Sequence, residues 1–157
     1  ISMVLSPNGD IVACGSQDNS IHFWRRCTGE DSMMAGYPFK PSLLSFDESG
    51  TFLASNGSID VTVWSFKGNG PEGTAPLSLK QHYEPITSLA FSNRGLHLAS
   101  GSRDGTVIVW KLHMDGIQYD LTGIHLVDSV SRLYWHPNDK ALAALDGQGG
   151  VTVWTIS

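Results

Sequence analysis

Four tryptophans recur at nearly constant spacing, and no other feature of the chain narrows its possible folds as much. Trp24, Trp64, Trp110 and Trp154 are separated by 40, 46 and 44 residues. A turn-rich segment and a β-branched run precede each of them, as in SGSRDGTVIVW, which ends at Trp110. A period of roughly 20 to 50 residues is typical of architectures in which each unit packs against its neighbours. The spacing therefore predicts four copies of one structural unit.

Each unit reads as short strands joined by tight turns. A second turn-rich segment lies further upstream of each tryptophan. The four segments are LSPNGD, FDESGT, FSNRGL and WHPNDK. Pro, Asn, Asp and Gly at such positions favour chain reversal. In the third unit we expect strands at about Ile86–Phe91, His97–Gly101, Thr106–Lys111 and Gly116–Leu121. We also expect a type I′ hairpin turn at Asp104–Gly105, because glycine readily adopts the positive φ that this turn requires.

The strands predict an all-β fold whose sheets are covered on both faces. No segment shows helical periodicity, and 17 glycines and 7 prolines would interrupt a long helix. Val107, Ile108 and Val109 precede Trp110 without a polar face. Strands that are apolar on both sides belong to sheets that are covered on both sides. Repeated four-stranded antiparallel sheets that cover one another form a β-propeller, which is the fold class that we predict.

Two sequence segments resemble a known type of repeat. LSPNGDIVACGSQDNSIHFW in the first unit and QHYEPITSLAFSNRGLHLASGSRDGTVIVW in the third resemble WD repeats, and all four units can be laid on this pattern. The aspartate that usually follows the tryptophan in this family is replaced by Arg25, Ser65, Lys111 and Thr155. The expected blades cover approximately residues 1–35, 36–80, 81–122 and 123–157, the first and last being incomplete.

The resemblance implies a buried tetrad of hydrogen-bonded side chains, which His82, Ser100, Asp104 and Trp110 match in the third unit. An indole N–H inside a sheet needs an acceptor, and a hydroxyl can accept it while donating to an imidazole. We therefore expect Trp110 to donate to Ser100, Ser100 to donate to His82, and Asp104 to hold the imidazole. A Ser-His-Asp catalytic triad is the alternative, but a hydroxyl that serves an internal indole is not open to substrate.

The other units retain fewer members of this tetrad. The retained residues are Asp18 and Trp24 in the first unit, Ser55 and Trp64 in the second, and Trp154 in the fourth. The replacements are Cys14 at the hydroxyl position of the first unit, and Tyr37 and Leu126 at the histidine positions of the second and fourth. We therefore expect the second and fourth blades to depend more on apolar packing, with Val61, Val63, Leu142, Val151 and Val153 as candidates.

Charge and composition argue against several classes of partner and site. The chain has 10 Lys+Arg and 15 Asp+Glu, a formal charge of −5, and its basic residues are scattered, so we expect no nucleic-acid binding. No run is apolar enough for a membrane span or a signal peptide, so we expect no membrane partner. Cys14 and Cys27 are too few for a disulfide framework, which favours the cytoplasm, with the nucleus as the alternative.

No cofactor and no metal site is expected either. Gly68–Gly73 spells a dinucleotide-binding fingerprint, but it precedes a strand instead of opening a helix, so we expect a surface loop. His22, His97 and His113 lie on strands of different units, which does not favour a shared metal.

The WD resemblance also implies a place for binding. WD propellers commonly bind peptides or proteins on the narrower face around the central channel, through the first strand and the residue before the tetrad aspartate. The corresponding positions are Gln17, Lys40, Ser42, Gly57, Pro85, Thr87, Arg103, Ser129, Ser131 and Gly147. Lys40 and Arg103 favour an acidic segment, and the alternative is that these positions are ordinary solvated loop residues.

We accordingly expect a non-catalytic protein-interaction scaffold. One alternative is a sensor domain of a larger signalling or effector enzyme. The other is a propeller enzyme, which would need several carboxylates or histidines at the channel mouth. Since propellers usually have about four to eight blades, three closures stay open. They are further blades from a longer seven- or eight-bladed chain, a second copy joined head to tail in a ring, and a four-bladed ring.

Overall fold

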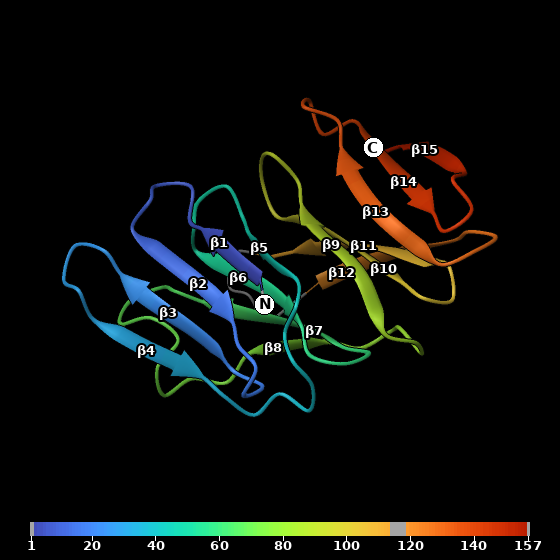
Figure 1. Cartoon of the computed structure of the whole chain (residues 1–157). Helices are drawn as coiled ribbons and strands as arrows, with labels where there is room; N and C mark the ends of the chain where they lie inside the picture. The colour runs from blue at the N-terminus through green and yellow to red at the C-terminus, as the bar shows by residue number, and fades with distance from the viewer. Residues whose placement is uncertain (1, 114–118, 157) are drawn as a thin grey trace.

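Antiparallel sheets that follow one another in chain order make up the protein (Figure 1). The computed structural model describes residues 2–113 and 119–156, and every regular element within these ranges is a β-strand. The first sheet contains β1 (Ser2–Leu5), β2 (Ile11–Gly15), β3 (Ile21–Arg25) and β4 (Asp31–Met34). The second contains β5 (Leu44–Phe46), β6 (Phe52–Asn56), β7 (Val61–Ser65) and β8 (Leu77–Leu79).

The remaining two sheets continue the same pattern. The third contains β9 (Ile86–Phe91), β10 (His97–Ser102), β11 (Thr106–Leu112) and β12 (Tyr119–His125). The fourth contains β13 (Val130–Trp135), β14 (Ala141–Asp146) and β15 (Val151–Thr155). In each sheet the strand order in space equals the strand order in the chain. The predicted all-β fold of repeated antiparallel blades is thus confirmed.

Each recurring tryptophan lies on the third strand of its sheet, opposite an apolar residue of the second strand. The four opposed pairs are Trp24 with Val12, Trp64 with Leu53, Trp110 with Leu98, and Trp154 with Leu142. The tryptophan period therefore marks equivalent positions in successive sheets.

The third blade departs from the sequence-based expectation at its outer strand. β12 pairs with β11 as far as His125, so the sheet ends there and not at residue 122. The predicted outer strand began at Gly116, and residues 116–118 lie outside the part of the chain that the structure describes.

The hairpin turn in this blade is of a different type from the one predicted. Gly105 has φ of +89°, whereas the φ of Asp104 is not positive. A type I′ turn would need positive φ at both residues. The amide of Gly105 donates to the carbonyl of Ser102 over 3.1 Å. A type I turn followed by one left-handed residue makes a three-residue loop with a G1 bulge, and this replaces the expected type I′ turn.

Adjacent sheets pack face to face through three apolar clusters. The cluster between the first and second sheets includes Phe23, Phe46 and Trp64, and the next, between the second and third, includes Phe52 and Trp110. The last joins the third and fourth sheets and is built from residues such as Val107, Val130, Leu133 and Leu142. Burying one such side chain stabilises the fold by about 1.5–3 kcal/mol. The two middle sheets are covered on both faces, which explains the strands that lack a polar side.

The outer faces of the end sheets carry exposed apolar side chains. Met3, Leu5, Trp24 and Met33 are exposed on the first sheet, and Tyr134, Val151 and Val153 on the fourth. They project from the faces opposite the two terminal clusters. These faces lack the cover that the middle sheets have within residues 2–113 and 119–156.

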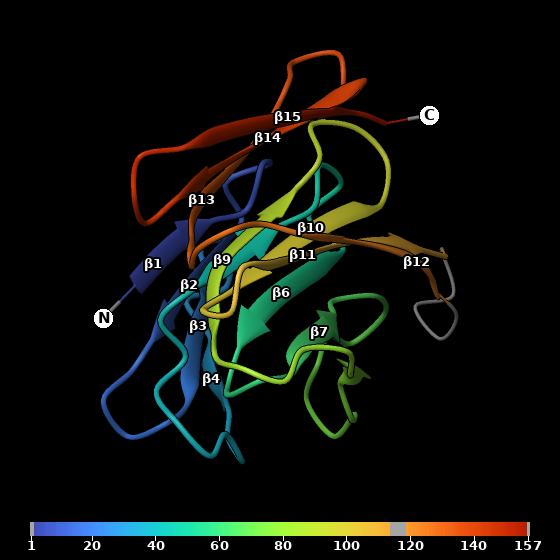
Figure 2. The ribbon, with the colours of Figure 1, turned by 90° about the vertical axis from the view of Figure 1, so that its right-hand side faces the viewer.

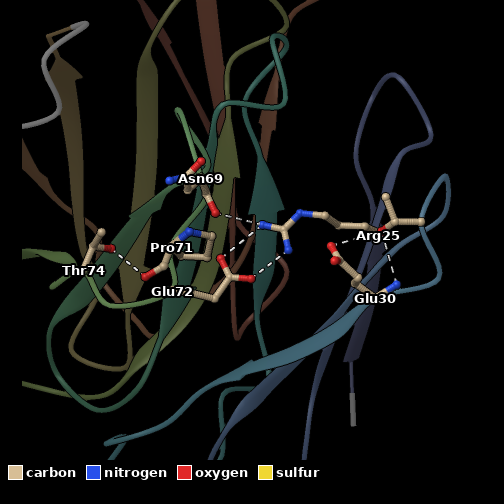
Figure 3. Close-up of polar contacts among 7 residues, drawn as sticks. Arg25, Glu30, Asn69, Pro71, Glu72 and Thr74 are labelled. Atoms are coloured by element: carbon tan, nitrogen blue, oxygen red, sulfur yellow. Dashed lines mark hydrogen bonds and ion pairs between the residues drawn. The ribbon is translucent and has the colours of Figure 1, made fainter.

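A long loop of the second blade crosses to the first blade. Figure 3 shows the guanidinium of Arg25 extended toward this loop, where it donates to both Glu72 carboxylate oxygens over 2.7 and 3.1 Å. It also donates to the carbonyl of Asn69 over 3.4 Å. Gly70 has φ of +89°, and a Cβ there would overlap Arg25 Nη2. The expected surface loop at 68–73 is therefore a strap between two blades, and the pKa of Glu72 is lowered by its bond to Arg25.

Close approach of the blades makes a clear prediction at Gly15. A Cβ on Gly15 would overlap the carbonyl oxygen of Pro41 at the start of the second blade, so Gly15→Ala must push the blades apart. We expect a loss of about 1–3 kcal/mol in the free energy of unfolding, measured by urea denaturation. Gly123→Ala is the matched control, because no atom lies within 4 Å of its added Cβ. Equal stability of the two variants would contradict this packing.

Candidate functional site

Three of the four predicted tetrad residues form a buried chain in the third blade. Trp110 Nε1 donates to Ser100 Oγ over 2.8 Å, and Ser100 Oγ lies 2.7 Å from His82 Nε2. A hydroxyl that accepts the indole hydrogen has its own hydrogen left to donate to Nε2. The neutral imidazole then carries its hydrogen on Nδ1. All three side chains are buried.

Asp104 does not hold the imidazole in the way that we expected. Its carboxylate accepts hydrogen bonds from the Ser102 hydroxyl and from the Thr106 amide, the latter over 2.9 Å. His82 Nδ1 is a buried atom without a hydrogen-bond partner within residues 2–113 and 119–156. The carboxylate therefore fixes the hairpin loop directly and reaches the imidazole only through its charge. Burial lowers the pKa of His82 to about 4, and the negative charge of Asp104 partly offsets this effect.

The arrangement does not serve nucleophilic catalysis by Ser100. Its side chain is fully buried, and its hydroxyl accepts the Trp110 indole hydrogen at the same time as it contacts His82. A nucleophile must reach a substrate carbonyl. The network instead joins the segment before β9 to the middle of the third sheet.

In the second blade Tyr37 stands at the histidine position and accepts the indole hydrogen, as Ser100 does in the third blade. Trp64 Nε1 donates to the Tyr37 hydroxyl over 2.7 Å, and this hydroxyl lies 2.6 Å from Ser55 Oγ. Gly57 lies against the Tyr37 ring, where a Cβ would overlap ring carbons. Burial raises the pKa of Tyr37. This blade therefore has a polar network of its own, and Val61 and Val63 are buried in the apolar cluster as expected.

The end blades have no such network among their expected tetrad residues. In the first blade Trp24 is 40% exposed on the outer face, and Asp18 contacts Ser20 and His22 near the surface. In the fourth blade Leu126 and Trp154 belong to the apolar cluster next to the third blade. The structure thus places Asp18 and Trp24 outside any buried tetrad.

The predicted binding residues are brought to one end of the sheets. The first strand of each blade begins at this end, and the turn between its second and third strands lies here too. One pair of opposed residues in each blade shows this. These pairs are Ser2 with Gly15, Leu44 with Ser55, Ile86 with Ser102, and Val130 with Asp146. We call this end the entry face, and all of the predicted binding positions lie on strands, loops or turns beside these pairs.

The predicted residues differ in how available they are. The exposed ones are Gln17, Lys40, Ser42, Pro85, Arg103, Ser131 and Gly147. Thr87 and Ser129 are half-buried, and Gly57 is buried. Thr87 Oγ1 donates to the carbonyl of Val130 over 2.5 Å and so joins two blades. Arg103 Nη2 forms an ion pair with Glu84 Oε2 at 2.9 Å, which reduces its attraction for an acidic partner.

Sequence reasoning missed the large apolar side chains of this face. Phe39 is 64% exposed, Tyr83 is 84% exposed and Val127 is 94% exposed. Each lies on the loop that leads into the first strand of a blade, and each is 44 residues from the next. Ile59 is exposed on a turn of the same face. The constant 44-residue interval could have identified these side chains, because a repeat places such loops at equivalent positions.

A pocket of about 290 Å³ lies beside the entry-face turn of the second blade. Its lining includes the residues Tyr37, Pro38, Asp60, Trp64, Pro76 and Ser78. In residues 2–113 and 119–156, no group of three or more His, Cys, Asp or Glu side chains could hold a metal ion. In the same ranges no helix is long and apolar enough to cross a membrane.

Known proteins share these sequence and structural features. The family profile described as "WD domain, G-beta repeat" matches residues 1–25 and 73–111. The target of rapamycin complex subunit wat1 of Schizosaccharomyces pombe is 27% identical over 93% of this chain and 45% of its own length. The protein transport protein SEC13 homolog A of Arabidopsis thaliana is 34% identical over 67% of this chain and 37% of its own length.

Solved structures agree with these relatives on the fold. A chain of the mitotic checkpoint complex aligns with a TM-score of 0.81 at 19% identity, over 98% of this chain and 47% of its own length. The RRP9 WD40 repeats align with a TM-score of 0.77 at 21% identity, over 98% of this chain and 47% of their own length. The chain belongs to the WD-repeat family and folds as blades of a WD-repeat propeller. It spans less than half the length of the two curated relatives named here.

The tyrosine network of the second blade is tested by Tyr37→Phe. This change removes only the hydroxyl and leaves the Trp64 indole hydrogen and Ser55 without their partner. A buried unsatisfied donor costs about 1–3 kcal/mol in the free energy of unfolding, which urea denaturation measures. Tyr134→Phe is the control, because Tyr134 is exposed on the outer face of the fourth blade. A stability loss that is equal in both variants would contradict the network.

The buried histidine of the third blade predicts a pH dependence of stability. Burial lowers the pKa of His82 to about 4, against 6.5 for an ordinary imidazole. Between these values the unfolded chain binds a proton that the folded chain does not. The free energy of unfolding therefore falls as the pH falls from 6.5 toward 4, by about 1.4 kcal/mol per pH unit at most. Urea midpoints at pH 7, 6 and 5 measure this slope, which His82→Gln should reduce. An unchanged slope in this variant would contradict the assignment.

Proposed function

We propose that this chain is a non-catalytic interaction module that binds a peptide or protein partner on its entry face. The observation that carries the proposal is the row of exposed apolar side chains at Phe39, Tyr83 and Val127. Aromatic residues are enriched at the energetically important centres of protein interfaces.

The polar residues of the entry face suit the rim of such an interface. Lys40, Gln17, Ser131 and Arg103 are exposed at the same end of the sheets. Polar and charged side chains around an apolar centre fix the orientation of a partner and contribute to the association rate. Because Arg103 already contacts Glu84, Lys40 is the better candidate for contact with an acidic group.

The scaffold beneath these loops supports recognition. Asn56 Oδ1 accepts the amide hydrogens of Ser42 and Leu43 over 3.0 and 2.8 Å, so the loop that carries Phe39 is held at its end. The loop that carries Tyr83 is held by His82 in the buried network. Binding residues on loops positioned by a rigid framework lose less entropy when a partner arrives.

The relatives also favour a partner that is a protein. One is a subunit of the target of rapamycin complex, one is a protein transport protein, and one similar structure is that of the mitotic checkpoint complex. The WD-repeat family generally supplies protein-interaction scaffolds. A role as the sensor domain of a larger signalling enzyme stays a prediction, as does closure of the ring by further blades or by a second copy.

The proposal is tested by cross-linking from two matched tyrosine positions. A photoreactive phenylalanine analogue at position 83 should cross-link a defined protein in cell extract, whereas the same analogue at position 134 should not. Both parent tyrosines are exposed, but Tyr134 lies on the flank of the fourth blade. Phe39→Ser with Tyr83→Ser should weaken capture of that protein by about tenfold or more without lowering the melting temperature. Equal cross-linking from both positions would contradict the proposal.

A further inference from the structure

A second surface lies at the opposite end of the third and fourth blades. There a groove of about 760 Å³ runs between the two sheets. Its lining includes the residues Arg94, Leu96, His97, Lys111, Lys140 and Ile156. Figure 2 shows the yellow-green turn after β9 beside the red end of β15, where this groove lies. We call this surface the cation groove.

Hydrogen bonds between the two blades hold the walls of the cation groove. The Asp139 carboxylate accepts the amide hydrogens of Asn93 and Arg94 over 2.8 and 2.7 Å, and the Asn93 side-chain amide over 2.8 Å. Within the fourth blade the amide of Ile156 donates to the carbonyl of Lys140 over 2.9 Å. The turns that carry Arg94 and Lys140 are thus locked together, and the groove has a defined shape before any partner arrives.

The charge of the cation groove is opposite to that of the chain. Arg94, Lys111 and Lys140 are three of the ten Lys and Arg residues of a chain whose formal charge is −5. All three are exposed. Asp120 lies opposite Lys111 in the strand register. Three cationic side chains that line one groove attract anions.

The lining of the cation groove also includes the carboxylate of Asp139. Its single negative charge offsets only part of the charge of Arg94, Lys111 and Lys140. Its two carboxylate oxygens accept three hydrogen bonds from Asn93 and Arg94. These bonds and the charge of Arg94 keep the pKa of Asp139 below its ordinary value despite burial. The carboxylate is therefore occupied in holding the turns.

The lining of the cation groove between the charges is apolar. Leu112 is buried, and Leu96, Ile156 and the ring of His97 are half-buried. The His97 ring lies against Trp135, with ring centroids 6.1 Å apart. A volume of about 760 Å³ with an apolar lining is far larger than a single inorganic anion fills, and suits several residues of a peptide.

We propose that the cation groove binds an acidic peptide segment of a partner protein, with carboxylates at Arg94, Lys111 and Lys140 and an apolar side chain on Leu96 and Ile156. This surface is separate from the entry face, since it lies at the other end of the same strands. Binding at the cation groove therefore does not depend on the function proposed for the entry face.

The test uses a fluorescein-labelled peptide of eight alternating leucine and glutamate residues as the probe. Fluorescence anisotropy should show saturable binding that weakens as salt rises. Lys111→Glu with Lys140→Glu should weaken this binding by about tenfold or more. A peptide with glutamine in place of glutamate should bind far more weakly than the probe.

Two controls separate the cation groove from general charge effects and from the entry face. Lys80→Glu with Lys67→Glu makes the same change in net charge on the second blade and should leave binding unchanged. Arg103→Glu on the entry face should also leave it unchanged. No saturable binding, equal loss in the Lys80/Lys67 variant, or binding of the glutamine peptide as tight as that of the probe would overturn the proposal.

Discussion

Burial of apolar surface between the faces of neighbouring blades is the interaction on which the rest of the structure depends. A four-stranded sheet has two faces, and one sheet alone cannot remove both from water. Phe23 and Trp64 fill the space between the first two blades, and Leu98 and Trp110 lie in the cluster between the second and third. Because this packing is non-directional, it holds the blades together without fixing their relative orientation. The directional contacts, such as the Arg25–Glu72 strap, then fix how one blade is oriented on the next.

The buried polar groups show how one requirement is met by different side chains. A tryptophan inside a sheet must place its N–H against an acceptor. Ser100 supplies the acceptor in the third blade, whereas the hydroxyl of Tyr37 supplies it in the second. Where the indole lies partly in water, as Trp24 does, no buried acceptor is needed. The tetrad pattern is thus one solution among several to the same energetic problem.

The sequence predicted the architecture well because periodic burial dominates it. Trp64 and Trp110 mark equivalent third strands, and the apolar run before Trp110 correctly predicted a sheet covered on both sides. Contacts between units were not predictable from local pattern. The loop that carries Glu72 reaches Arg25 across 47 residues of sequence, and a left-handed Gly105 after Asp104 fits both hairpin types. The exposed apolar residues of the entry face, such as Tyr83, were missed because local pattern does not distinguish an exposed aromatic residue from a buried one, and only their 44-residue interval marks them.

We propose that rigid blades present their entry loops as one recognition surface. Hydrogen–deuterium exchange of the chain, free and bound to the protein recovered by cross-linking, tests this claim most directly. Amides in residues 37–42, 80–85 and 126–129 should exchange more slowly in the complex, while the outer strands β4 and β8 should exchange at unchanged rates. Protection confined to the outer strands or to the flank of the fourth blade, with unchanged entry loops, would contradict the account.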